Sequence, residues 1–157
     1  MKSIDDWLDA YGESHQNKTN KQIHWICVPL IMVTLLGLLS LVNFGFSINQ
    51  GSYNIDLATI LIILAIIFYV RLSIAITLGM VFFSGCSIQF ISILENSYTS
   101  SELLVIYLVT FIIAWIGQFI GHKIEGKKPS FFEDIQFLLI GPAWLLSFIY
   151  KKIGIKY

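Results

Sequence analysis

The sequence predicts an all-α membrane protein, a multi-pass transmembrane helical bundle with four spans and a re-entrant or interfacial C-terminal helix. Of the 157 residues, 56% are hydrophobic and only 13% are charged, whereas soluble domains carry about 25% charged residues. The mean hydropathy of +0.75 is also too high for a soluble surface. The apolar residues gather in long stretches without a repeat or linker, so residues 1–157 are predicted to form a single integral membrane domain.

The N-terminal segment is predicted to lie on the membrane surface. Residues 4–14 fit a short amphipathic helix, because its apolar side chains share one face. That face consists of Ile4, Trp7, Leu8 and Tyr11. The polar, acidic start of the chain resembles neither a signal peptide nor a transit peptide. The first span is therefore expected to act as the membrane address.

The spans are predicted from the roughly 20 apolar residues that a bilayer crossing needs. Residues 23–43 form the first span, with Trp25 at the interface and Pro29 near the helix start, where proline is tolerated.

The apolar block at 55–94 is too long for one crossing. Its one charge, Arg71, indicates a turn between two spans, 55–70 and 72–94. Residues 102–121 form the fourth span.

The fifth apolar stretch, 135–150, is short and carries Gly141-Pro142 at its middle. Proline removes a backbone donor, so we expect it to break regular helix there. The segment is therefore predicted to be membrane-associated, as a re-entrant or interfacial helix, without crossing the bilayer.

The distribution of basic residues favours four crossings with a cytoplasmic N-terminus, because short cytoplasmic loops collect Lys and Arg. With four crossings, the opposite loops 44–54 and 95–101 contain no basic residue. All the basic residues then share one side: Lys2, Lys18, Lys21, Arg71, Lys123, Lys127, Lys128, Lys151, Lys152 and Lys156. A fifth crossing would place the three tail lysines outside, and this alternative stays open.

All three histidines fall on that same side. His15 and His24 lie at the start of the first span, and His122 lies at the end of the fourth. On a helix, Gln118 and Glu125 share a face with His122. Imidazole is a common ligand of Fe, Zn, Cu or Ni, and a nearby amide or carboxylate can fix its tautomer. The alternative is that the histidines are ordinary interfacial residues.

Several function classes are excluded or weakened. A formal net charge of +0 gives no case for nucleic-acid binding. Three histidines are too few for a di-iron desaturase or hydroxylase, and the chain has no zinc-protease, Walker or nucleophile-elbow motif. Cys27 and Cys86 suit buried thiols better than a disulfide framework or zinc site. A transporter is weakened by the lack of an ionisable residue at mid-membrane.

The motif pattern resembles that of the membrane-bound iron-dependent 2-hydroxy fatty acid dioxygenase family. The pattern consists of His15, Asn20, His24 and Pro29, then Gln118-Phe-Ile-Gly-His122, Glu125-Gly-x-Lys128-Pro129 and Gly141-Pro142. The resemblance implies an alpha-oxidation, in which a 2-hydroxy fatty acid and O2 yield CO2 and a fatty acid one carbon shorter. In one place the chain departs from the pattern: many relatives carry an acidic residue shortly after the Gly-Pro, and here 143–148 contains none.

The resemblance also implies the composition of the site. It implies His15, His24 and His122 as ligands of iron, Fe(2+), and it points to Asn20, Gln118 and Glu125 as catalytic residues whose individual roles are unassigned. The implied partners are the 2-hydroxy fatty acid, O2 and the lipid bilayer, and the sequence predicts no oligomeric state. The compact chain favours a bacterial inner membrane over the endoplasmic reticulum. A non-catalytic protein that binds lipid or a partner remains the alternative function.

Overall fold

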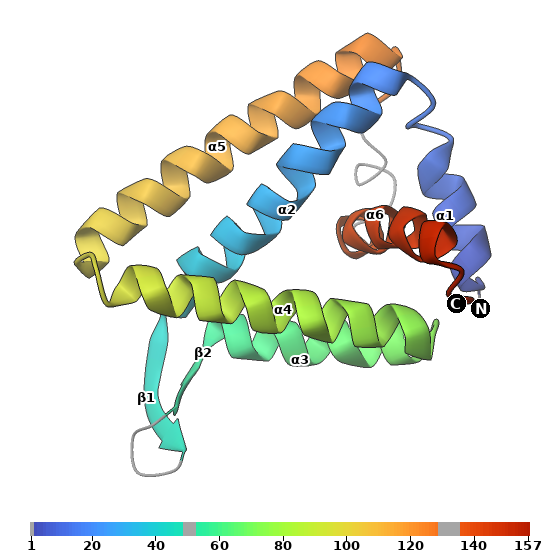
Figure 1. Ribbon diagram of the computed structural model, residues 1–157. Helices are drawn as coiled ribbons and strands as arrows, with labels where there is room; N and C mark the ends of the chain where they lie inside the picture. The colour runs from blue at the N-terminus through green and yellow to red at the C-terminus, as the bar shows by residue number, and fades with distance from the viewer. Residues whose placement is uncertain (1, 49–52, 129–135) are drawn as a thin grey trace.

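The computed structural model describes residues 2–48, 53–128 and 136–157. The all-α prediction is confirmed, and the described residues add one short antiparallel hairpin. In Figure 1 the helices lie in three pairs: α2 beside α5, α3 beside α4, and α1 beside α6. The elements are α1 (Ile4–Gly12), α2 (Lys18–Ser40), β1 (Asn43–Ile48), β2 (Tyr53–Asp56), α3 (Leu57–Val70), α4 (Ile74–Glu95), α5 (Ser100–Glu125) and α6 (Phe137–Ile153).

The predicted amphipathic N-terminal helix is present as α1. A capping box between Ser3 and Asp6 begins the helix. The apolar face is buried as expected, with Ile4, Trp7, Leu8 and Tyr11 in the core. This face packs on α6, where the rings of Trp7 and Phe137 meet edge to face at 5.3 Å. The apolar face of α1 is therefore covered by protein. In a helix lying on the membrane surface, this face would contact lipid instead.

The helices α2 and α5 pack closely through small residues, as membrane helices commonly do. Gly117 and Gly121 lie four positions apart on α5 and face α2. The close contacts are Gly37 with Tyr107, Gly117 with Cys27, and Gly121 with Asn20. This interface matters for function, because each of the two helices carries one of the histidines.

Substituting Gly37 by alanine is expected to lower the thermal unfolding midpoint. A Cβ there would lie 2.7 Å from the ring of Tyr107, which is almost fully buried. Overpacking of this kind costs about 1–3 kcal/mol. Gly85→Ala in α4 is the matched control, since its Cβ would meet nothing within 4 Å. Thermal unfolding in detergent tests the pair, and a Gly37→Ala midpoint at or above that of Gly85→Ala would contradict the expectation.

Three described helices, α2, α4 and α5, are long and apolar enough to cross a bilayer, and α3 is a shorter apolar helix. Their outer faces expose large apolar side chains such as Phe82 and Ile113, so the chain is a membrane protein. Arg71 caps the end of α3 and begins the turn to α4, as predicted. In Figure 1 this turn and the start of α2 lie on one side, away from the hairpin. The topology of four crossings remains a prediction.

The helix α6 corrects one expectation. It runs without a break through Gly141 and Pro142, so the prediction that this pair interrupts regular helix is wrong. Proline removes only the hydrogen bond to the Leu138 carbonyl, and both residues are buried in the packed core. Gly141 leaves room for Tyr11, whose hydroxyl would lie 2.9 Å from a Cβ at that position. Packing on α1 thus offsets the lost hydrogen bond. The re-entrant or interfacial placement of α6 stays a prediction.

Candidate metal centre

Three buried imidazoles converge from separate parts of the chain. His15 lies in the loop between α1 and α2, His24 in the second turn of α2, and His122 near the end of α5. Their exposed fractions are 0%, 0% and 5%. The ring centroids lie 4.3, 4.9 and 5.0 Å apart, and one nitrogen from each ring lies within 4.8 Å of the others. The three histidines that the sequence places on one side thus lie together in one cluster, and their role as metal ligands stays a prediction.

Backbone carbonyls fix the tautomers of two of the rings. The Nδ1 of His15 lies 2.6 Å from the carbonyl of Tyr11, and the Nδ1 of His24 lies 3.0 Å from the carbonyl of Asn20. A carbonyl only accepts, so both Nδ1 atoms donate and both Nε2 atoms keep a lone pair. These two Nε2 atoms face each other at 3.0 Å. Two lone pairs at this distance repel each other unless a cation or proton lies between them.

The third ring has one nitrogen without a hydrogen-bond partner. The Nδ1 of His122 is buried, and it has no hydrogen-bond partner in the described part of the chain. Leaving such a group unsatisfied costs about 1–3 kcal/mol. A metal ion could be bound by one nitrogen from each ring. Two nitrogens that each lie about 2.1 Å from one ion are at most about 4.2 Å apart, so the three nitrogens, which lie within 4.8 Å of one another, would need to move only a few tenths of an ångström closer. The donor set therefore fits a divalent metal such as Fe, Zn, Cu or Ni.

Burial sets the protonation states of His15 and Tyr11. It lowers the pKa of His15 to about 3, chiefly because the imidazolium is desolvated, and the nearby His24 ring adds to the effect. The ring is therefore neutral at neutral pH, as a metal ligand must be. Burial also raises the pKa of Tyr11, so its hydroxyl keeps its proton.

Glu125 ties the ends of the site together. Its carboxylate accepts hydrogen bonds from the backbone amides of Gln16 and Asn17, at 2.8 and 2.9 Å, and from Nδ2 of Asn20 at 3.0 Å. These bonds join the end of α5 to the loop that follows His15 and to the first turn of α2. Through these contacts Glu125 holds the segments that carry the three histidines in place.

The other two predicted residues lie beside the histidines. Asn20 is fully buried and donates to the carbonyl of Ser14 as well as to Glu125. Gln118 lies one turn before His122 and comes within hydrogen-bonding reach of the His24 ring. All six residues predicted for the site thus lie close together. Asn20 and Glu125 connect the neighbouring segments through hydrogen bonds, and Gln118 faces a cavity.

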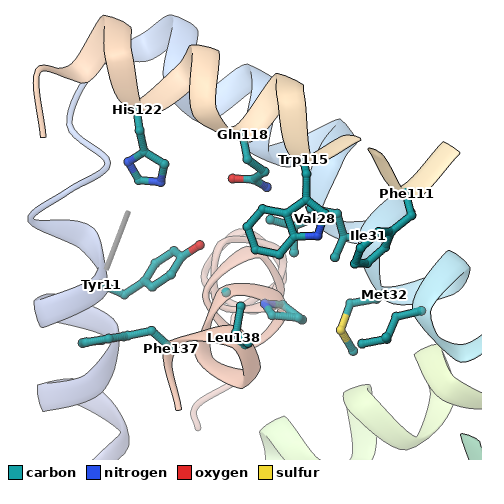
Figure 2. A pocket seen from close by; sticks show the side chains of 13 residues that line it. Tyr11, Val28, Ile31, Met32, Phe111, Trp115, Gln118, His122, Phe137 and Leu138 are labelled. Atoms are coloured by element: carbon teal, nitrogen blue, oxygen red, sulfur yellow. The ribbon is translucent and has the colours of Figure 1, made fainter. Parts of the chain in front are cut away.

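That cavity, of about 260 Å³, begins at the histidine cluster and runs between α2, α5 and α6 (Figure 2). Its polar end carries Tyr11, Gln118 and His122. The other lining residues are apolar or aromatic: Val28, Ile31, Met32, Leu35, Phe111, Trp115, Phe137, Leu138, Gly141 and Pro142. From His122 to Phe111 the wall formed by α5 is about 16 Å long. The shape suits an amphiphile whose head group meets the histidines and whose chain lies among the helices.

Residues 1–153 match the family described as 2-hydroxy-palmitic acid dioxygenase Mpo1-like. The chain belongs to this family. One Mpo1-like relative is the protein named 2-hydroxy-palmitic acid dioxygenase MPO1 of Saccharomyces cerevisiae, which is 27% identical over 149 residues. The match covers 94% of this chain and 79% of the yeast protein. No solved structure matches the chain. Membership of the Mpo1-like family confirms the resemblance inferred from the motifs.

For this Mpo1-like chain, sequence reasoning missed the wall of the cavity. The sequence places Tyr11 on the apolar face of the N-terminal helix and in one polar cluster with His15, Asn20 and His24. It did not predict that the Tyr11 ring stacks on His15, with centroids 4.1 Å apart and planes 12° apart. Its position four residues before His15 was the available signal. Trp115 and Phe111 lie one and two turns before Gln118 and could have been placed on the same face of α5 by helical spacing.

Proposed function

We propose that this protein is an Fe(II)-dependent dioxygenase that converts 2-hydroxy fatty acids into fatty acids one carbon shorter, with release of CO2. The observation that carries the proposal is the convergence of three buried imidazoles at the polar end of a long apolar cavity. The name of the yeast relative, a 2-hydroxy-palmitic acid dioxygenase, supports the substrate class. The number of histidines leaves coordination positions for substrate and O2.

The proposed reaction balances with water as the third product. The bond between C1 and C2 breaks, C1 leaves as CO2, and C2 becomes the carboxyl carbon of the shorter acid. The electrons removed from the substrate reduce O2, which supplies one oxygen atom to the new carboxyl group and one to water. Iron held by His15, His24 and His122 would supply the redox chemistry and a positive charge near the carboxylate.

The residues of the chain itself would bind and orient the substrate. The apolar wall removes the acyl chain from water or lipid, and each square ångström of apolar surface withdrawn from water contributes about 25 cal/mol. Trp115 and Phe111 shape the wall along α5, as Figure 2 shows. Glu125 and Asn20 hold the ligand-bearing segments in register through their hydrogen bonds. The head group would thus be held at the end of the cavity next to His122.

The proposal predicts iron-dependent conversion of 2-hydroxypalmitate to pentadecanoic acid. Purified protein would be loaded with Fe(II) without oxygen and then mixed with aerated substrate labelled with carbon-13 at C1. Mass spectrometry should detect the shorter acid and labelled CO2, and palmitate should remain unconsumed as the control, because it lacks the 2-hydroxyl group. Binding of the fatty acid without any product would contradict the proposal and favour the non-catalytic lipid-binding alternative.

We also propose in which cellular membrane the protein lies. The apolar helices make the chain a membrane protein, and a bacterial inner membrane, in preference to the endoplasmic reticulum, remains our proposal for its location. Fractionation of the native cells tests this, with the protein expected in the inner-membrane fraction.

A further inference from the structure

Tyr11 occupies the point where α1, the histidine cluster and the cavity meet. Its ring stacks on His15, and its backbone carbonyl accepts the hydrogen bond from Nδ1 of that histidine. On the other side the ring packs against Phe137 and Trp144 of α6, with centroids 6.0 and 5.4 Å away. The absence of a side chain at Gly141 lets the hydroxyl approach α6. The ring is therefore held in one orientation by aromatic contacts on both sides.

The hydroxyl of Tyr11 points into the cavity, as Figure 2 shows. In the described residues this hydroxyl makes no hydrogen bond, although the side chain is only 7% exposed. Two other buried tyrosines differ in this respect: the hydroxyl of Tyr69 donates to the carbonyl of Leu139 at 2.6 Å, and that of Tyr150 donates to the carbonyl of Ala75 at 2.8 Å. Buried hydroxyl groups are normally bonded in this way. The donor of Tyr11 is left for a molecule in the cavity.

A fatty-acid carboxylate in this cavity needs such a donor. No Lys or Arg is among the described residues that line it. An anion in apolar surroundings is costly unless it is paired and hydrogen-bonded, and a hydrogen bond to a charged group is roughly twice as strong as a neutral one. Besides the histidine, the polar side chains at this end of the cavity are Tyr11 and Gln118.

We propose that the hydroxyl of Tyr11 donates a hydrogen bond to the carboxylate of the bound fatty acid and so positions the head group at the histidine cluster. This inference rests on the proposed function, because it assigns the substrate contact within the same site. It makes Tyr11 a residue that recognises the acid as opposed to the acyl chain. A neutral ester with the same acyl chain would lose most of the stabilisation that the hydrogen bond from Tyr11 gives to a charged carboxylate.

The test is fatty-acid binding to the full-length protein without iron, which separates recognition from catalysis. Tyr11→Phe keeps the ring and its stacking on His15 but removes the donor. Palmitate should bind this variant about tenfold to a hundredfold more weakly than wild type, the effect of losing one hydrogen bond to a charged group, whereas the affinity for methyl palmitate should change much less. Tyr107→Phe is the matched control, since Tyr107 is a buried tyrosine whose hydroxyl also has no described partner but lies outside the lining of the cavity.

A second readout uses the iron-loaded protein. The KM for 2-hydroxypalmitate should rise in Tyr11→Phe while the iron content stays at the wild-type level. Equal palmitate affinity in wild type and Tyr11→Phe would overturn the inference, as would an equal loss in Tyr107→Phe. If wild type binds palmitate but never consumes 2-hydroxypalmitate, the proposed function fails, and the binding comparison still decides the role of Tyr11.

Discussion

Replacing any one of His15, His24 or His122 by alanine is expected to abolish iron binding and the consumption of 2-hydroxypalmitate. These are the only histidines of the chain, so no other imidazole can take the vacated position. Loss of residues that merely support ligands lowers metal affinity about 10- to 100-fold, and loss of a ligand should exceed this. Iron content after dialysis and product formation by mass spectrometry measure the effect.

The matched control for these variants is Lys123→Ala, which removes an exposed side chain next to His122. It should keep wild-type iron content and activity. Added Fe(II) should also raise the thermal midpoint of wild type and of Lys123→Ala but not of the histidine variants, because a metal that binds only the folded state stabilises it by mass action. Full activity in all three histidine variants would refute the assignment of these ligands.

Replacing Glu125 by alanine is expected to loosen the site without removing a ligand. It leaves the amides of Gln16 and Asn17 and the side chain of Asn20 without their acceptor. Because water can replace part of the interaction at this half-exposed position, we expect a loss of about 1–3 kcal/mol in the free energy of unfolding. The loop after His15 would be released from α5, so iron affinity should fall about 10- to 100-fold, as when supporting residues are removed from other metal sites.

Glu13→Ala is the control for this experiment, since Glu13 is an exposed carboxylate near the same loop. Glu125→Gln should fall between alanine and wild type, because it retains one acceptor oxygen. Thermal unfolding and iron titration measure both quantities. If Glu125→Ala unfolds and binds iron like Glu13→Ala, the hydrogen bonds that Glu125 accepts do not stabilise the site.

Much of the fold followed from local patterns. Arg71 interrupts an apolar block and could only be accommodated at a turn, and the spacing from Ile4 to Tyr11 is that of a helix with one apolar face. The meeting of the histidines followed from topology, because helices that begin and end on the same side bring His24 and His122 together. These features depend on residues close in sequence or on the side at which each helix ends.

The remaining features depend on contacts between distant segments. The amphipathic pattern predicts that the apolar face of α1 is buried, but it does not predict that α6 is the helix that buries it. Pro142 could be judged only by its local cost, whereas burial against α1 keeps α6 regular. Glu125 shares a helical face with His122, yet its hydrogen bonds reach a loop more than a hundred residues earlier. Roles of this kind appear only once the helices are packed.

The most direct test of the central claim is X-ray absorption at the iron edge of the protein loaded with Fe(II). The account predicts bound iron with the scattering pattern of imidazole rings, reduced in the His15→Ala, His24→Ala and His122→Ala variants. Iron that fails to bind, or that binds in a shell without imidazole, would contradict the claim that His15, His24 and His122 form the metal centre.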